Sequence, residues 1–414
     1  MTGDPEESRP GGRVGLVLSG GGARAAHELG ALSVLMPVLE QRGERPRIIV
    51  GTSAGALNAA YLAAGADRGW GSVVEAGCRL WRDIRYGEVL GPLLSARDLG
   101  LVLRFGLEFA GAGVGGVPSL LDDAPLTDTI QARISFGQLA RNVKSGVIEV
   151  AGVAATSYQT GRSVVFYHGP AGPARDDKRA IDYAPVCLTA THIRASAAIQ
   201  VLFPAVQVTE PGDMGGCYGD GGTSLNTPLK PALAFGAERL IVIGLNSTAG
   251  SPRSAAPRPV DAFDGAAQVV QALLANQLAH DVPTLATINQ IAAARPPAAP
   301  GVPAADEHRV IPYIFVAPRE RFAVGRLAST IYRRRYAGLR GLRRAPSLAL
   351  LGRLLDAARD PAHGELFSYV FFAPEFAAAL IEQGRQDAQW WLEQEHHDGP
   401  WHVDNPPGAQ GESA

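Results

Sequence analysis

Two side chains in this sequence have the types and settings that ester chemistry needs, Ser53 and Asp220. Ser53 lies in a Gly-x-Ser-x-Gly pattern between Gly51 and Gly55, directly after the apolar residues Ile48–Val50. A buried strand that runs straight into a helix must turn sharply, and glycines on both sides remove the Cβ atoms that would clash there. We therefore expect Ser53 at the tip of a strand-helix turn, near the positive end of the helix dipole.

A serine hydroxyl becomes a nucleophile only when a base removes its proton. Asp220 is the candidate base, because it lies at the end of a predicted strand and is followed by Gly221 and Gly222, which let a loop fold over the serine. Burial would raise the proton affinity of this carboxylate. The histidines that an α/β-hydrolase would use instead do not directly follow a clear strand; they are His280, His308 and His363. We therefore predict a Ser-Asp dyad, and a surface Asp-Gly turn is the alternative.

The same reaction needs N–H donors for the oxyanion that develops on the substrate carbonyl. Three consecutive glycines, Gly20, Gly21 and Gly22, follow an apolar strand predicted at Val14–Leu18. This strand should neighbour the one before Ser53, so we expect the glycine N–H groups to point at the substrate carbonyl. Arg24 should brace the loop or meet an anionic head group. A dinucleotide-binding turn is the alternative, but the second strand lacks the acidic residue for a ribose, and the sequence contains no Gly-Lys-Ser/Thr of a P-loop.

The elements that must position these residues predict an α/β fold. The strand at Val14–Leu18, the helical pattern of Ala25–Leu39 and the strand at Ile48–Val50 form one βαβ unit, which should be right-handed. Further strands are predicted at 147–154, 163–167, 206–209, 240–245 and 310–316. The last of these should join the same sheet, because an isolated apolar strand needs a sheet to pair with.

We predict one catalytic core over residues 13–317, a three-layer sandwich in which helices flank a mostly parallel central sheet. Within it, the apolar, glycine-punctuated segment 66–125 is predicted to be a helical insertion, which is either extra core packing or a mobile cap that lines an acyl-chain channel. Residues 318–395 should form a helical extension packed on the core. Three low-complexity or polar segments complete the chain: a disordered leader at 1–12, a flexible loop at 296–305 and a disordered tail at 396–414.

Four motifs occur in the order and context found in patatin-like phospholipases, and the sequence resembles this family from Val14 to about Leu245. The motifs are Ser19–Arg24, Gly51–Gly55, Arg194–Pro204 and Asp220–Leu229. The segment 366–376 is similar to the C-terminal part of bacterial members. The resemblance implies a Ser53–Asp220 dyad, a glycine-rich oxyanion hole and hydrolysis of fatty-acyl esters without a metal or another cofactor. Two residues depart from the family pattern, Ala25 in place of glycine and Gln200 in place of proline, and both could reshape the pocket.

Composition narrows the range of partners and compartments. The 414-residue chain carries a formal net charge of −2, so its overall charge gives no reason to expect nucleic acid binding. Its three cysteines have neither disulfide nor zinc-site spacing, which favours a reducing compartment. We see no signal peptide and no apolar run of the roughly 18 residues that span a bilayer. We expect a cytoplasmic protein, either soluble or peripheral to a membrane.

An arginine-rich run, Arg319–Arg344, alternates with aromatic and aliphatic residues. It is either a solvated helical face or a surface that contacts an anionic membrane, with the arginines on lipid phosphates. The predicted partner is in either case an acyl lipid substrate. Within the same enzyme class, an acyltransferase would use the same dyad with an alcohol in place of water. The rival from another class is a catalytically silent lipid-binding protein.

Overall fold

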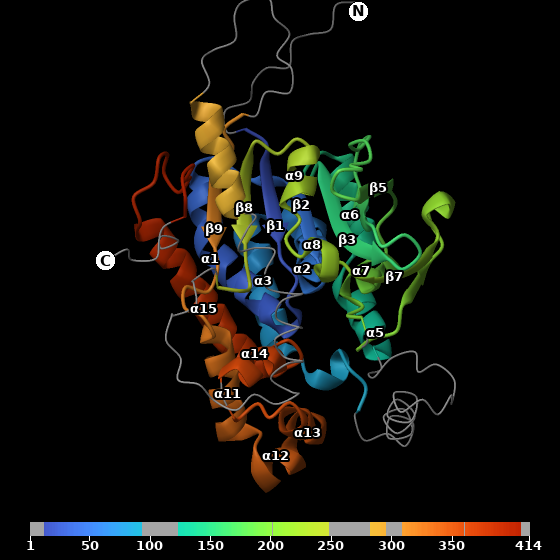
Figure 1. Ribbon diagram of the computed structural model, residues 1–414, viewed down its shortest axis with the longest axis vertical. Helices are drawn as coiled ribbons and strands as arrows, with labels where there is room; N and C mark the ends of the chain where they lie inside the picture. Colours follow the sequence, from blue (N-terminus) through green and yellow to red (C-terminus); the bar gives the residue numbers. More distant parts are fainter. Residues whose placement is uncertain are drawn as a thin grey trace, which may run out of the picture.

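The computed structural model describes residues 12–92, 123–200, 202–247, 282–294, 309–359 and 361–406. The centre of this part of the chain is one sheet of nine strands (Figure 1). Seven of them lie in the order β5-β4-β3-β2-β1-β8-β9, while β7 joins both β3 and β6. The strands are β1 (Val14–Leu18), β2 (Pro46–Thr52), β3 (Val150–Ser157), β4 (Ser163–His168), β5 (Ile181–Pro185), β6 (Val206–Val208), β7 (Gly216–Asp220), β8 (Arg239–Ile243) and β9 (Tyr313–Val316).

Parallel pairing dominates this sheet, which confirms the predicted fold class. The pairs β1–β2, β1–β8, β2–β3, β4–β5 and β8–β9 are parallel, and the pairs that involve β3 with β4 or β7, and β6 with β7, are antiparallel. Strand β1 is buried along its whole length, as its uninterrupted apolar sequence predicts for a strand covered on both faces. Strand β9 pairs with β8, so the strand predicted near residue 313 does join the same sheet.

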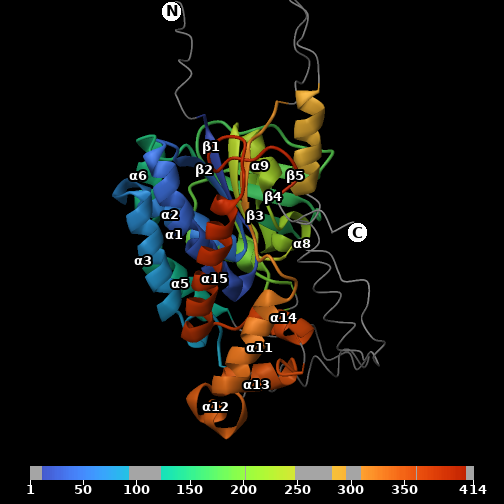
Figure 2. The same ribbon diagram turned by 90° about the vertical axis from the view of Figure 1, so that its left-hand side faces the viewer.

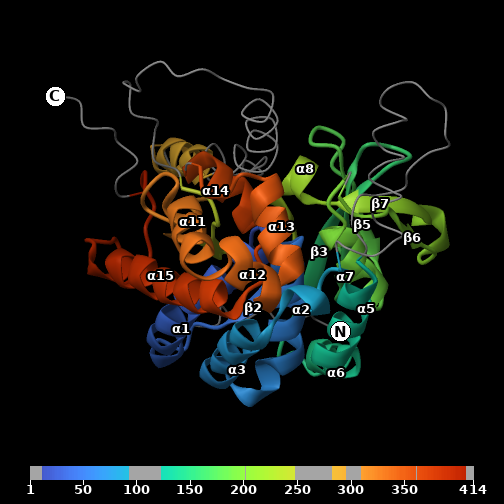
Figure 3. The ribbon, with the colours of Figure 1, turned by 90° about the horizontal axis from the view of Figure 1, so that it is seen from below.

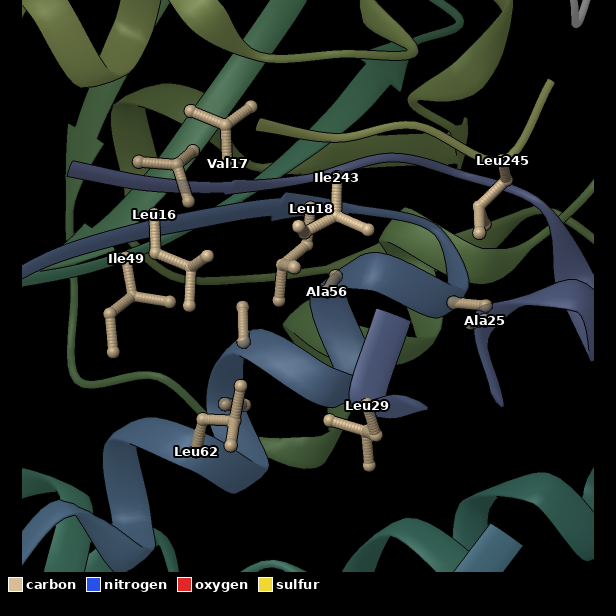
Figure 4. Packing of buried hydrophobic residues seen from close by; sticks show 14 of the residues in the cluster. Leu16, Val17, Leu18, Ala25, Leu29, Ile49, Ala56, Leu62, Ile243 and Leu245 are labelled. Atoms are coloured by element: carbon tan, nitrogen blue, oxygen red, sulfur yellow. The ribbon is translucent and has the colours of Figure 1, made fainter. Parts of the chain in front are cut away.

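Helices cover both faces of the sheet and give the three predicted layers. Helices α1 (Ala26–Gln41), α2 (Ala54–Gly65) and α3 (Trp70–Asp83) lie on one side, while α9 (Leu229–Ala234) and a helix over residues 282–293 lie on the other (Figure 2). Figure 4 shows Leu16, Ile49 and Ile243, from three neighbouring strands, packed with Ala56 and Leu62 of α2. The end of the sheet at which β2 leads into α2 is therefore held in place by tight packing between the strands and α2.

The segment predicted at 66–125 is only partly described, and residues 93–122 lie outside the described residues. Its described part contains η2 (Ala66–Arg68), α3 and η3 (Tyr86–Glu88), and α5 (Ala124–Arg133) and α6 (Phe136–Lys144) follow. Helix α3 buries Trp70, Val73, Cys78 and Trp81 against the core. The smaller helices of the second half of the core are α7 (Ala190–Ala197), η4 (Gly212–Met214) and α8 (Gly222–Leu225).

The region predicted to be helical after residue 318 contains five helices in its described part. They are α11 (Ala323–Arg335), α12 (Gly338–Arg344), α13 (Pro346–Leu354), α14 (Pro361–Ser368) and α15 (Pro374–Glu393). Helix α15 lies directly on α1, and glycines make this close approach possible. A Cβ on Gly30 would lie 2.1 Å from Ile381 O, and one on Gly384 would lie 2.1 Å from His27 O. Within the described residues, the helices are all too short or too polar to cross a membrane.

The prediction of a disordered tail over 396–414 is wrong for residues 396–406. Trp401 is fully buried, and its indole N–H donates to Glu44 Oε2 at 2.9 Å. Tyr313 and His402 exchange two backbone hydrogen bonds of 2.8 Å, so the tail extends the edge of the sheet beyond β9. The prediction followed the polar composition of this segment and gave no weight to its single tryptophan, Trp401. Residues 407–414, 1–11 and the loop predicted at 296–305 lie outside the described residues.

Candidate active site

Strand β3 brings the ends of two other strands together. Strand β2 runs parallel to β3, and its last residue, Thr52, pairs with Ala154. Strand β7 runs antiparallel to β3, and its last residue, Asp220, pairs with the next residue, Ala155. Because β4 occupies the other side of β3 along this stretch, β7 lies on the same side as β2. The two strands therefore meet end to end, and Ser53 lies beside Asp220.

Ser53 and Asp220 are in direct contact. Ser53 Oγ donates a hydrogen bond of 2.5 Å to Asp220 Oδ2, and the two residues are 5% and 2% exposed. Asp220 Oδ1 accepts a second hydrogen bond of 2.6 Å from the N–H of Gly222. Burial raises the pKa of Asp220 to about 6, although both hydrogen bonds act in the opposite direction. The carboxylate is therefore ionised at neutral pH and close to the pKa that suits a general base.

The backbone of Ser53 has the strained geometry of a nucleophile at a strand-helix turn. Its φ is 55° and its ψ is −124°, a conformation that residues other than glycine rarely adopt. Both flanking glycines are needed, because a Cβ on Gly51 would lie 2.2 Å from Gly55 O, and one on Gly55 would lie 2.6 Å from Leu18 O. Helix α2 begins at the next residue, so its N-terminal N–H groups lie around the serine.

Ser196 of α7 fixes this turn, and sequence reasoning missed it. The N–H of Ser53 donates to Ser196 Oγ at 2.9 Å, and that hydroxyl donates to Ala154 O at 2.5 Å. The side chain of Ser196 thus joins the turn at Ser53 to β3, the strand with which β7 pairs at Asp220. The segment Arg194–Pro204 carried the only signal for this role, but no local pattern shows which of its small residues turns inward.

The glycine loop after β1 passes close to Ser53, as predicted. A Cβ on Gly20 would lie 3.1 Å from the Cβ of Ser53. The N–H of Gly20 is committed elsewhere, because it donates to Asn226 O at 3.1 Å, so the prediction that Gly20 supplies an oxyanion donor is wrong. The N–H groups of Gly21 and Gly22 have no hydrogen-bond partner among the described residues. These two remain the candidate oxyanion donors, and Gly22 lines the same pocket as Ser53.

Arg24 braces the loop and is too deeply buried to meet a lipid head group. Its side chain is fully buried, with Nε donating to Ser368 Oγ and Nη1 to Asn246 Oδ1, both at 2.7 Å. Nη1 lies 3.2 Å from Glu365 Oε1, and the guanidinium stacks 3.8 Å above the centre of the Tyr369 ring. Of the two predicted roles for Arg24, bracing the loop and meeting an anionic head group, the structure shows the bracing.

Tyr369, far along the chain, closes the glycine loop from outside. Its carbonyl oxygen accepts a hydrogen bond of 2.9 Å from the N–H of Ala23. The same oxygen would lie 2.1 Å from a Cβ on Gly22, where φ is 57°. Tyr369, Val370 and Phe372 also line the pocket at Ser53. The C-terminal region therefore supplies both a support for the loop and a wall of the site, which sequence reasoning missed although it noted the similarity of 366–376 to bacterial family members.

The pocket that opens at Ser53 is apolar. Its space, including open solvent at the mouth, is about 840 Å³. Helices α2, α3 and α5 and the segment after α7 contribute most of its lining, chiefly Leu57, Leu80, Trp81, Ile84, Leu126, Ile130, Ile134, Ile199 and Phe203. The indole N–H of Trp81 donates to Asn58 Oδ1 at 2.9 Å, which fixes the α3 wall against α2. The described part of segment 66–125 thus both packs on the core and lines the pocket.

The two departures from the family pattern affect the site differently. Gln200 Nε2 donates to Asp220 O at 3.0 Å and to Thr223 Oγ1 at 3.2 Å, so this side chain holds the loop that carries Asp220. Ala25 is fully buried, and its carbonyl oxygen accepts from Asn58 Nδ2 at 2.9 Å. Gln200 therefore holds Asp220 through its backbone, whereas Ala25 belongs to the packing beneath the glycine loop.

The remaining residues considered in the sequence are Gly221, after Asp220, and the three candidate histidines. A Cβ on Gly221 would lie 2.3 Å from Ala154 O, so this loop needs glycine to approach β3. His363 is buried, and its Nδ1 lies 3.2 Å from Leu355 O. His280 and His308 lie outside the described residues. Among the described residues, the hydrogen-bond partner of Ser53 Oγ is Asp220 and not a histidine.

Comparisons with known proteins fit this geometry. A family model described as patatin-like phospholipase matches residues 16–233. No curated protein matches the chain. Human GIVD cytosolic phospholipase A2 is similar in structure, with 14% sequence identity, a TM-score of 0.42, and coverage of 94% of this chain and 60% of that one. VipD from Legionella pneumophila has 14% identity, a TM-score of 0.30, and coverage of 75% and 62%. The chain thus spans less than two thirds of the length of either solved chain.

Proposed function

The chain belongs to the patatin-like phospholipase family, and on that premise we propose that it hydrolyses fatty-acyl esters of lipids, with Ser53 as the nucleophile and Asp220 as the base. The observation that carries this proposal is the hydrogen bond of 2.5 Å between Ser53 Oγ and Asp220 Oδ2. The apolar pocket beside it supports a substrate with a long acyl chain, because apolar lining favours hydrocarbon over polar groups.

In the first half of the reaction, Ser53 Oγ attacks the carbonyl carbon of the acyl ester while Asp220 takes the hydroxyl proton. The negative charge that forms on the carbonyl oxygen is stabilised by the N–H groups of Gly21 and Gly22. The bond between the carbonyl carbon and the alcohol oxygen then breaks, and the protonated Asp220 returns its proton to that oxygen. The products are a free lipid alcohol and an acyl group bound to Ser53.

In the second half, water replaces the lipid alcohol. Asp220 takes a proton from the water as the water oxygen attacks the acyl carbonyl carbon, and the oxyanion forms in the same place. The bond to Ser53 Oγ breaks, the proton passes from Asp220 to the serine oxygen, and a fatty acid leaves. No net proton change remains on the enzyme. The raised pKa of Asp220 suits these transfers, because the carboxylate must accept and release a proton in each half.

The experiment combines active-site labelling with product analysis. A fluorophosphonate probe should label the wild-type protein at Ser53, and Ser53→Ala should abolish labelling. Ser53→Ala and Asp220→Asn should each reduce hydrolysis of acyl lipids by at least about 10³-fold while the melting transition is retained. The exposed residues Ser145 and Asp213 provide matched controls, as Ser145→Ala and Asp213→Asn should leave the rate unchanged.

Three outcomes would contradict the proposal in distinguishable ways. Full activity in Ser53→Ala or Asp220→Asn would remove the dyad from the mechanism. An unlabelled and inactive wild-type protein would favour a silent lipid-binding protein. Esters formed with an added alcohol, in place of free fatty acid, would show an acyltransferase that uses the same residues.

We also propose that the enzyme meets its substrate at an anionic membrane surface, through part of the arginine-rich run Arg319–Arg344. What supports this is the charge of the run and its position on helices α11 and α12. Sedimentation with vesicles of defined charge tests it, and binding that is the same for neutral and anionic vesicles would contradict it.

A further inference from the structure

Helix α12 and the end of α13 expose apolar side chains to an unusual degree. Leu339 is 78% exposed, Leu354 is 64% exposed and Leu342 is 39% exposed. Among the described residues, seven large hydrophobic side chains are exposed, and these three fall within a stretch of 16 residues. Single exposed leucines are common, but a cluster that includes the two most exposed ones indicates a surface that another phase or molecule covers.

The same stretch is strongly basic. Between Glu320 and Asp356 the chain contains no acidic residue but has nine arginines. These are Arg321, Arg326, Arg333, Arg334, Arg335, Arg340, Arg343, Arg344 and Arg353. A surface with apolar and only positive side chains suits the interface of an anionic bilayer, where leucines enter the head-group region and arginines meet phosphates.

Carboxylates elsewhere in the fold neutralise some members of the predicted run. Arg335 and Arg344 both pair with Glu375, at 3.4 and 2.6 Å. Arg326 pairs with Glu320, and Arg319 lies 3.3 Å from Asp387. These arginines serve the packing of α11, α12 and α15, so the whole run Arg319–Arg344 is not one binding surface.

Within the run Arg319–Arg344, four arginines remain exposed and have no carboxylate partner among the described residues: Arg333, Arg334, Arg340 and Arg343. Arg333 and Arg334 lie in the last turn of α11, while Arg340 and Arg343 alternate with Leu339 and Leu342 along α12. We define these four arginines together with Leu339, Leu342 and Leu354 as the basic tip. Its apolar and charged side chains come from three helices that follow one another in the chain, α11, α12 and α13.

We propose that the basic tip docks on an anionic lipid bilayer and that the substrate is a lipid within that bilayer. The charge of the tip favours an anionic bilayer as the partner. An apolar face alone would fit many partners, whereas unpaired arginines require phosphates or other anions. The first clause narrows the proposed membrane contact to seven named residues, and only the second clause, which names where the substrate lies, rests on the proposed hydrolysis. The docking itself does not depend on the chemistry at Ser53.

The tip is joined to the wall of the pocket. Helix α11 packs on α14, and the chain that leaves α14 forms the pocket wall at Tyr369, Val370 and Phe372. Figures 1 and 2 show α12 and α13 at the lower end of the molecule, below α5 and α14, and Figure 3 is the view from that end. Docking through the tip would therefore turn the end that carries the pocket-lining helices towards the bilayer.

The test measures binding of the full chain to vesicles of phosphatidylcholine alone and of phosphatidylcholine with phosphatidylserine. The wild-type protein should bind the anionic vesicles more tightly, and added salt should weaken that binding. The double variant Arg340→Gln/Arg343→Gln should weaken it by about tenfold or more. Leu339→Ser should also weaken it, without any change of charge. The matched control is Arg175→Gln/Arg179→Gln, which removes two exposed arginines from the loop before β5 and should bind like the wild type.

Activity measurements separate failure of the docking from failure of the proposed function. The tip variants should hydrolyse lipid in anionic vesicles more slowly but a soluble short-chain ester at the wild-type rate. If no protein hydrolyses either substrate, the proposed function fails while the vesicle binding still decides the docking. The docking is overturned if the tip variants, with unchanged melting temperatures, bind anionic vesicles as well as the wild type does. It is equally overturned if the control variant loses binding as they do, or if the tip captures an acidic protein but no vesicle.

Discussion

The turn at Ser53 and the C-terminal region contribute to one candidate site in different ways. The shape of the turn at Ser53 depends mainly on neighbouring residues, because Gly51 and Gly55 leave room for it. From farther along the chain, Ser196 adds one hydrogen bond by accepting from the N–H of Ser53. The C-terminal region acts over more than 340 positions, where Ser368 and Tyr369 hold the loop at Arg24. The shape of the turn is thus encoded mainly by neighbouring residues, and the support for the glycine loop is encoded at long range. Substitutions that change the contacts of one region and leave the other intact test this difference.

The largest effect is expected from Arg24→Met, which removes the buried polar contacts between the glycine loop and the C-terminal region. The variant leaves Glu365 and Asn246 in a buried space without their positive partner, so we expect a loss of about 3–5 kcal/mol in the free energy of unfolding. Catalysis should also fall, because the glycine loop loses its brace. Chemical denaturation and kcat/KM for a soluble ester measure the two effects.

Arg239→Met is the matched control for Arg24→Met. Arg239 also joins the core to the C-terminal region, since it contacts Glu44 at 2.8 Å and Asp398 at 3.2 Å. It lies at the first residue of β8, at the opposite end of the sheet from Ser53. This variant should lose stability but keep kcat/KM in the folded protein. If both variants change kcat/KM equally, the special role of Arg24 is refuted.

A somewhat smaller effect is expected from Gly22→Ala. The new Cβ would lie 2.1 Å from Tyr369 O, so either the loop or the C-terminal segment must move. Displacing one oxyanion donor costs on the order of 10²-fold in kcat, or about 3 kcal/mol, which steady-state kinetics would detect. Gly69→Ala is the control, because Gly69 also has a positive φ, 86°, but no atom within 4 Å of a new Cβ. Equal kinetics in the two variants would mean that backbone strain, and not contact with Tyr369, explains the loss.

The smallest effect is expected from a change of pH. Because burial raises the pKa of Asp220 to about 6, the fraction of ionised base falls below that pH, and kcat/KM should be about tenfold lower at pH 5 than at its plateau. A pH profile with a soluble ester measures this. An inflection near pH 4 would show that Asp220 is solvated in the free enzyme, and one near pH 7 or above would point to another base.

The same shift in pKa has a consequence for stability whose sign is opposite to that of a paired carboxylate. The folded protein binds the Asp220 proton more tightly than the unfolded chain, so this group favours folding below pH 4 and loses that contribution as the pH rises through about 6. Asp220→Asn should therefore raise the melting temperature at pH 8, and the difference from the wild type should shrink towards pH 4.

Sequence patterns predicted the sheet and the turn at Ser53 because both depend mainly on short-range signals. Apolar runs such as Val14–Leu18 must be buried on both faces, and a serine between close glycines has few other conformations. The patterns failed where a role depends on a partner far away. Gly20 belongs to the predicted glycine loop, yet its N–H bonds to Asn226, and Trp401 lies in a polar tail whose packing partner is Glu44. No local pattern contains that information.

Because β2 and β7 meet end to end, the contact between Ser53 and Asp220 depends on the alignment of the strands as well as on the two motifs. Thr52 and Asp220 pair with consecutive residues of β3. A slip of β7 by a single residue would turn the aspartate to the opposite face of the sheet. A related chain with one residue inserted in the turn before β7 could therefore display both signatures intact and still be unable to deprotonate its serine.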